Sequence, residues 1–347
     1  MDAAGELQDV AAGLSGLSFG SGLTGEEEKL RPLRARAAGL TFCGLAHALY
    51  LCKLAHSLRY LALGASSIGP AQPGGDALCV GILGLGRTGK QLLLSLLDMT
   101  AIKASHIKVS TRRPQNAVEF LQNRVECFFD NGRLAAWADL LFLCCLPSHL
   151  PKVCADLHSR LSKHCLVYSF ISAVPVARLT KLLRHDFIIK PQYDIVGGAT
   201  ADVWLSCTDL SMALREPLLI EASCPLTMSG GITLNLNWVC TVLYSLLNIC
   251  TSASLPSSEA LSLMNSLFMG KRTHTVQLNA QSFISSFHAS SLGGDEPFPW
   301  ISLTDAQSKE TPLLRFLSSN KSMQQRISEA YKSLLETPVS SDSYTLL

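Results

Sequence analysis

The sequence predicts an α/β fold in which a doubly wound parallel sheet is followed by a smaller all-α C-terminal domain. Short apolar runs alternate with helical patterns from residue 77 to about residue 190, as expected of strands joined by crossover helices. A glycine-rich turn links the first run to the first helical pattern. After about residue 212 the strand signals stop and apolar helical patterns take over.

The composition limits the class of protein. The 347 residues are 48% hydrophobic and 16% charged, which excludes a disordered chain and is enough for about two domains. Lys and Arg number 29 against 27 Asp and Glu, so no basic excess favours nucleic acid as a partner. None of the twelve cysteines has C-x-x-C spacing, which favours reduced thiols over a metal site.

The segment before the sheet is predicted to hold a flexible start, a helix over 30–63 and a Pro/Gly linker at 66–75. Its longest uncharged apolar stretch, Ala37–Cys52, has sixteen residues where a membrane span needs about 20, so no membrane partner is expected. Lys53 and Arg59 predict an amphipathic helix on the protein surface. Acidic residues near the start favour a cytoplasmic location and leave a mitochondrial one open.

The sheet is predicted from five apolar runs, most of them without polar alternation, as is typical of strands covered on both faces. These runs are Ala77–Leu83, His106–Ser110, Leu140–Leu146, Cys165–Ile171 and Phe187–Ile189. The helices expected between them are Lys90–Leu97, Pro114–Asn123 and Val176–Arg184.

The rest of the chain is predicted to be helical. Ile232–Cys250 and Ser258–Met269 predict apolar helices, and Met323, Ile327 and Leu334 mark a final amphipathic one. The Ser/Gly/Pro-rich stretch 282–312 is left unassigned. The predicted parts are a flexible segment, helix and linker at 1–75, a nucleotide-binding domain at 76–211, a helical domain at 212–336 and a disordered tail at 337–347.

The turn after the first strand reads Gly84, Leu85, Gly86, Arg87, Thr88, Gly89 and fits G-x-G-x-x-G. At a strand-to-helix junction this pattern predicts a Rossmann dinucleotide site, whose helix N-terminus faces the pyrophosphate. The same turn also fits the start of a P-loop, but Gln91 stands where that motif needs Ser or Thr for Mg²⁺. A purely structural glycine turn is the remaining alternative.

The residues after the second strand indicate which dinucleotide binds. An NAD site places an acid there for the ribose 2′-hydroxyl, whereas this chain has Ser110, Thr111, Arg112 and Arg113. Guanidinium groups pair with a 2′-phosphate, while a carboxylate repels it. NADP(H) is therefore the predicted cofactor, and a solvated arginine pair at the end of a strand is the alternative.

Residues 77–195 resemble the N-terminal half of the pyrroline-5-carboxylate reductases. The motifs that carry the resemblance are the strand with its glycine turn, Arg113-Pro114, Asp130-Asn131, Ala138–Leu143 leading to Pro147, and Ser169–Val174. The resemblance implies an NADPH-dependent oxidoreductase of the type used in proline biosynthesis. It also implies a homodimer through the C-terminal helices, for which Ile232–Cys250 is the candidate; a buried helix of a monomer is the alternative.

The resemblance also assigns cofactor contacts. It places Gly84–Thr88 on the pyrophosphate, Arg112 and Arg113 on the 2′-phosphate, and Asn131 beside the adenosine ribose. The residues that it places along the nicotinamide-side ribose are Cys144, Cys145, Leu146, Pro147, Phe170, Ile171 and Ser172.

The chain departs from the family on the substrate side. Leu146 replaces the usual Lys, and Lys190-Pro191-Gln192 replaces Met-Pro-Asn. The family's Ser-Pro-Gly-Gly-Thr-Thr loop is reduced to Ser291-Leu292-Gly293-Gly294-Asp295. This comparison leaves two function classes: a reductase of a small imine or carbonyl, and an NADP(H)-binding regulatory protein without turnover.

A carbonyl substrate would need a proton donor, whereas a protonated imine is already activated. The candidate donors follow the predicted strands at their carboxyl ends, where such sites form. They are His149, Lys190, Tyr193 and Asp194.

Overall fold

The computed structural model describes residues 24–65, 77–117, 124–196, 199–207, 209–227, 229–268 and 276–337. Its main element is a six-stranded, fully parallel sheet in the order β3-β2-β1-β4-β5-β6. The strands are β1 (Val80–Leu83), β2 (Ile107–Ser110), β3 (Glu126–Phe128), β4 (Leu140–Leu143), β5 (Leu166–Ser169) and β6 (Ile188–Ile189). The predicted doubly wound parallel sheet is confirmed. The short β3, which is half-buried, was not predicted.

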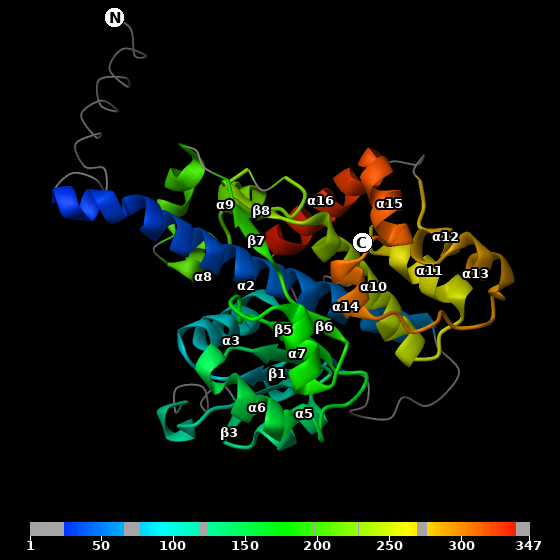
Figure 1. Ribbon diagram of the computed structural model, residues 1–347, viewed down its shortest axis with the longest axis horizontal. Coiled ribbons are helices and arrows are strands. Elements are labelled where there is room, and N and C mark those ends of the chain that lie inside the picture. Colours follow the sequence, from blue (N-terminus) through cyan, green and yellow to red (C-terminus); the bar gives the residue numbers. More distant parts are fainter. Residues whose placement is uncertain are drawn as a thin grey trace, which may run out of the picture.

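Each face of the sheet is covered by its own layer of helices (Figure 1). On one face, α3 (Arg87–Met99) packs with the long helix α2 (Gly25–Ala65). On the other face lie α5 (Asn131–Trp137), α6 (Leu150–Leu157) and α7 (Val176–Leu183). A helix was expected over 114–123. Its first part is a 3₁₀ turn, η3 (Pro114–Ala117), and the remainder lies outside the described residues. The other 3₁₀ segments are η2 (Ala104–His106), η4 (Pro147–His149) and η5 (Ala199–Ser206).

The C-terminal part is mainly helical, as predicted. Its helices are α8 (Leu210–Ala213), α9 (Pro217–Ser223), α10 (Leu236–Ser252), α11 (Ser257–Ser266), α12 (Ala280–Phe283), α13 (Ser286–Ser291), α14 (Leu303–Ser308), α15 (Pro312–Ser319) and α16 (Lys321–Glu336). The prediction that Ile232 begins a helix is wrong. Ile232–Leu234 forms β8, which pairs antiparallel with β7 (Tyr193–Ile195), and the Asn235 side chain then caps α10.

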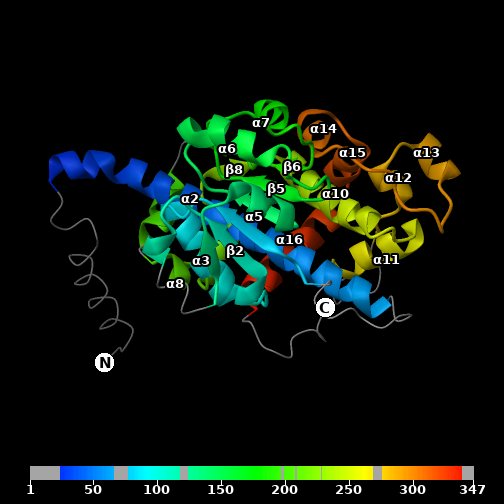
Figure 2. The ribbon, with the colours of Figure 1, turned by 90° about the horizontal axis from the view of Figure 1, so that it is seen from below.

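Helix α2 crosses the molecule between the sheet and the C-terminal helices (Figures 1 and 2). Every residue of α2 from Phe42 to Cys52 is buried, so the prediction of a surface helix is wrong. By length and composition α2 could cross a membrane, but 72% of its most apolar stretch is buried inside the protein, as in the core helix of a globular domain.

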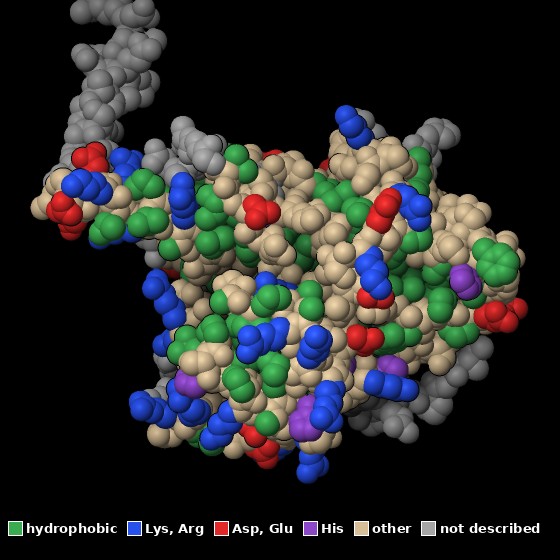
Figure 3. Space-filling view, viewed as in Figure 1, with side chains coloured by type: hydrophobic (Ala, Val, Ile, Leu, Met, Phe, Trp, Pro, Cys, Tyr) green, Lys and Arg blue, Asp and Glu red, His purple; other side chains and the backbone are tan. Residues whose placement is uncertain are grey.

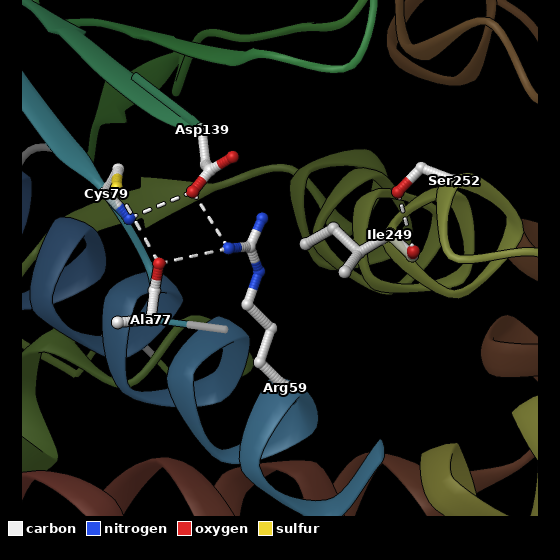
Figure 4. A network of polar contacts seen from close by, with 6 residues as sticks. All are labelled: Arg59, Ala77, Cys79, Asp139, Ile249 and Ser252. Carbon is white, nitrogen blue, oxygen red and sulfur yellow. Dashed lines mark hydrogen bonds and ion pairs between the residues drawn. The ribbon is translucent and has the colours of Figure 1, made fainter. Parts of the chain in front are cut away.

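The far end of α2 is tied to the start of the sheet by a small polar network (Figure 4). Arg59 Nη1 lies 2.8 Å from Asp139 Oδ2 and donates to the Ala77 carbonyl at 3.4 Å. The same Asp139 oxygen accepts the backbone N–H of Cys79 at 2.9 Å. One carboxylate therefore joins α2, the residue before β4 and the approach to β1. The Ser252 hydroxyl drawn beside it bonds to the Ile249 carbonyl within α10.

Candidate functional site

The glycine turn between β1 and α3 has the geometry that each glycine of the motif predicts. Gly84 has φ +98°, a backbone conformation that residues with a side chain rarely adopt. A Cβ on Gly89 would lie 1.9 Å from the Gly84 carbonyl oxygen, so the third glycine lets helix and strand pack closely. A Cβ on Gly86 would meet no described atom within 4 Å. The backbone at Gly86 is therefore open to a ligand.

A cavity of about 940 Å³ lies above this turn at the carboxyl ends of the strands. Most of the predicted cofactor residues line it. They are Gly84, Leu85, Gly86, Arg87, Thr88, Thr111, Arg112, Arg113, Asn131, Cys144, Cys145 and Leu146. The strand order reverses between the neighbouring strands β1 and β4, and doubly wound sheets bind ligands at such a switch point.

Other predicted cofactor residues do not line this cavity. Gly89 is buried beneath it, and Pro147 begins η4 at its edge. Phe170 packs inward against Phe142 and Tyr168, with ring centroids 6.1 and 5.2 Å away. Ile171 is buried in the core on the face of α7, whereas Ser172 is exposed. The described cavity therefore covers the glycine turn and the ends of β2 and β4, without reaching the segment after β5.

The cavity wall is strongly cationic, with residues from the start of α3, the end of β2 and α6. Arg87, Lys90, Arg112, Arg113 and Lys152 all line the cavity. Arg112 and Arg113 are exposed, and within the described part of the chain neither forms an ion pair. Figure 3 shows Lys and Arg side chains spread over the part of the molecule that contains α5 and α6. This wall suits a ligand with several negative charges.

Hydrogen bonds hold the side chain of Asn131, which the resemblance places beside the adenosine ribose. The Ser110 hydroxyl donates to Asn131 Oδ1 at 2.7 Å, and Asn131 Nδ2 donates to Asp156 Oδ2 at 2.9 Å. Asp130 caps α5 by accepting the Arg133 N–H, which sets Asn131 at the first helical position. The side chain of Asn131 is thus held between β2 and α6.

Of the candidate proton donors, His149 alone lines the cavity. It is half-buried and sits at the junction of η4 and α6. Lys190 is half-buried, burial lowers its pKa, and its backbone N–H donates to Gln307 Oε1 at 3.0 Å. Asp194 is exposed on β7.

Tyr193 belongs to a buried aromatic cluster that includes α2. Its hydroxyl donates to His47 Nδ1 at 2.7 Å, while His47 Nε2 donates to the Ser223 carbonyl at 2.9 Å. Burial lowers the pKa of His47 to about 4 and raises the pKa of the Tyr193 hydroxyl well above its usual value. The Tyr331 ring lies 5.8 Å from the His47 ring. Tyr193 is therefore placed to hold α2, and its hydroxyl is not exposed to the cavity.

The reduced substrate-loop motif has a structural role in this chain. Ser257 Oγ donates to the Gly293 carbonyl at 2.9 Å, and Ser258 Oγ donates to the Gly294 carbonyl at 2.9 Å. These bonds tie the segment to the first turn of α11. Neither glycine lines the described cavity.

The cavity thiols are weak nucleophiles. Burial raises the pKa of Cys144 and of Cys145, which keeps both protonated at neutral pH.

Several lining residues were not predicted from the sequence. They are Leu83, Lys90, Ser110, Phe129, Ser148, Lys152, Val153 and Asp156. Lys152, Val153 and Asp156 lie on α6, and the interval of three to four residues that puts them on one helix face was the available signal.

Comparison with known proteins places the chain in a family. A family model described as NADP oxidoreductase, coenzyme F420-dependent, matches residues 79–172. The mouse protein called NADP-dependent oxidoreductase domain-containing protein 1 is 37% identical over 334 residues, which cover 92% of this chain and 91% of the mouse protein. The chain belongs to the family of that mouse protein. The family resemblance predicted from the sequence is confirmed, since both matches are to proteins with an NADP oxidoreductase domain.

This member of the NADP-dependent oxidoreductase domain-containing family is also similar to solved structures. A pyrroline-5-carboxylate reductase from Coxiella burnetii is 14% identical, with a TM-score of 0.32, over 76% of this chain and all of that one. The Plasmodium falciparum pyrroline carboxylate reductase with NADP bound is 13% identical, with a TM-score of 0.30, over 75% of this chain and 98% of that one.

Proposed function

We propose that this chain binds NADPH and uses it to reduce a small imine or carbonyl compound. The observation that carries the proposal is the cavity itself, in which an open glycine turn faces two exposed arginines that follow β2. Backbone N–H groups at the start of α3 suit a pyrophosphate, and the Arg112 and Arg113 guanidiniums suit a 2′-phosphate. No acid follows β2, where an NAD site would carry one.

The residues present fit the cofactor. The open space at Gly86 admits a phosphate against the backbone, and five cations balance a polyanion. When bound, NADPH supplies a hydride at its nicotinamide ring. The chain's own groups then have to orient that ring and, for a carbonyl substrate, hold a proton near it. Among the candidate proton donors His149 lines the cavity, whereas a protonated imine would need no donor.

Pyrroline-5-carboxylate is the first substrate to test. The Coxiella burnetii reductase is named for this compound, which as a cyclic imine belongs to the proposed class. We also propose that the protein is cytoplasmic, acts in proline biosynthesis and forms a homodimer. Of the 17 residues of α10, 12 are buried within one chain, which favours the alternative of a core helix for this segment.

The choice of cofactor is tested by removing the arginine pair. We expect Arg112→Ala with Arg113→Ala to weaken NADPH binding on the order of a hundredfold, because charge-assisted hydrogen bonds to the 2′-phosphate are lost. NADH binding should change little. The matched control is Arg34→Ala with Arg36→Ala, which removes the same charge from an exposed part of α2. Equal losses for NADPH and NADH would contradict the assignment.

A regulatory protein that binds NADP(H) without turnover is the second candidate. It is favoured by the buried Tyr193 hydroxyl and by the structural use of the Gly293-Gly294 segment. The two candidates are separated by NADPH absorbance with pyrroline-5-carboxylate and a panel of imines and ketones. Oxidation of NADPH with any of them supports the reductase. Tight NADPH binding with no oxidation across the panel supports the regulatory protein.

A further inference from the structure

The cavity contains a carboxylate that the binding of a polyanion does not explain. Asp156, on the last turn of α6, is the one acid among the described residues that line it. Its Oδ2 accepts from Asn131 Nδ2 at 2.9 Å. Among the described residues no hydrogen bond or ion pair uses its Oδ1, and the residue is exposed. One oxygen is therefore held in place and the other is available to a ligand.

Electrostatics restricts what this oxygen can accept. A carboxylate beside phosphates weakens their binding unless a ligand N–H or O–H bonds to it. At the adenosine end of NADPH the available donors are the 3′-hydroxyl and the 6-amino group of adenine. The 3′-hydroxyl adjoins the 2′-phosphate, so a carboxylate there would face a second anion at short range. The 6-amino group lies on the far edge of the base, so a carboxylate bound to it is not repelled at short range by the 2′-phosphate.

A second observation marks the same end of the cavity as a site for a flat ring. Phe129, which follows β3, lines the cavity with 57% of its surface exposed. The Thr111 N–H donates to the Phe128 carbonyl at 2.8 Å, which holds the end of β3 beside the residues preceding Arg112. Val153, on α6 one turn before Asp156, supplies apolar surface to the same cavity. An exposed aromatic ring beside an arginine pair suits stacking on a purine.

We infer that Phe129 and Asp156 form an adenine-recognition subsite, in which Phe129 stacks on the base and Asp156 Oδ1 accepts a hydrogen bond from the 6-amino group. This inference rests on the proposed function, because it concerns the adenosine end of the same cofactor. Asp156 then determines specificity, since it favours a 6-amino purine over a 6-oxo purine. In a 6-oxo purine an acceptor oxygen would face the carboxylate.

The test compares NADPH with reduced nicotinamide hypoxanthine dinucleotide phosphate, in which the 6-amino group is replaced by an oxo group. Dissociation constants are measured by calorimetric titration of the full chain. The unaltered protein should bind NADPH at least about tenfold more tightly than the hypoxanthine analogue. Asp156→Asn should tighten binding of the analogue and bring the ratio close to one, because an amide can donate to the 6-oxo group. A gain in affinity for the analogue cannot arise from misfolding.

Two further variants complete the test. Phe129→Ala should weaken the binding of both dinucleotides about tenfold and leave the ratio of their dissociation constants unchanged. Asp305→Asn, which alters an exposed acid of α14 outside the cavity, should leave both affinities and their ratio unchanged. Equal affinity of the unaltered protein for both dinucleotides would overturn the subsite while leaving the proposed function intact. Failure of the unaltered protein to bind NADPH at all would instead overturn the proposed function.

Discussion

Alanine at Gly86 should weaken NADPH binding strongly without harming the fold. Gly86 precedes α3 with φ −76°, which alanine adopts without strain, and a Cβ there meets no described atom within 4 Å. Replacing Gly by Ala restricts the unfolded chain, which stabilises the protein by about 0.4–1 kcal/mol, and Ala is a poorer helix cap than Gly by a similar amount. These terms offset each other, so the melting temperature should stay within about 3 °C of the original.

In contrast to the thermal stability, the affinity for NADPH should change strongly in Gly86→Ala. The added methyl group occupies the space where a pyrophosphate approaches the backbone, so charge-assisted bonds of about 1.5–3 kcal/mol each are lost. Loss of one of them weakens NADPH binding by about 10- to 150-fold. Thermal unfolding and fluorescence titration with NADPH measure the two effects on the same sample. Unchanged NADPH affinity in Gly86→Ala would refute the placement of the phosphates at this turn.

Gly89→Ala is the matched contrast. Its Cβ would lie 1.9 Å from the Gly84 carbonyl oxygen, a backbone atom that cannot turn away. Helix α3 must then move from β1, at a cost of about 1–3 kcal/mol or more. We expect a melting temperature lower by about 4–10 °C. If both variants unfold alike, the distinction between a packing glycine and a binding glycine is wrong.

Two further predictions concern the burial of α2. Because burial lowers the pKa of His47 from 6.5 to about 4, the folded state binds fewer protons than the unfolded state between these values. The free energy of unfolding should therefore fall as pH drops from 6.5 to 4, by about 1.4 kcal/mol per pH unit, and urea titrations should show a shallower fall in His47→Gln. Arg59→Gln should destabilise the protein by about 1 kcal/mol, and Asp139→Ala by more, because the latter also leaves the Cys79 N–H without its acceptor. Chemical denaturation that ranks these two variants in the opposite order would contradict the network in Figure 4.

The part of the fold that the sequence predicted is the part with local signals. Uniformly apolar runs separated by a glycine turn predicted β1, α3, β4 and β5, because buried parallel strands and phosphate-binding turns have distinctive compositions. Strand β8 was missed, since Ile232–Leu234 runs directly into apolar α10. Asn235, a favourable helix cap, was the signal that separates them.

The burial of α2 was unpredictable for a different reason. Polar residues on a helix usually mark a solvated face, but three of those on α2 have partners inside the protein. His47 bonds to Tyr193 and Ser223, Lys53 donates to the Leu334 carbonyl, and Arg59 pairs with Asp139. These partners lie 80 or more residues away, so no local pattern reveals them.

The residues that line the cavity were predictable where a motif fixes backbone geometry and less so elsewhere. Arg112 and Arg113 follow β2, and Asn131 belongs to the Asp130-Asn131 motif of the resemblance. The structure places all three at the cavity. Asp156 and Phe129 belong to no motif, because their position depends on how α6 and the end of β3 pack beside β2. Tyr193 follows β6, yet it turns toward His47, which sequence position alone does not indicate.

The central position of α2 has a consequence for how the protein is made. Tyr50 packs against Tyr331 with ring centroids 5.0 Å apart, although the two residues lie at opposite ends of the chain. At ordinary rates of synthesis, the ribosome needs roughly fifteen to fifty-five seconds to add the residues between them. During that interval the apolar surface of α2 lacks its last partner, so we expect the nascent chain to depend on chaperones until α16 emerges.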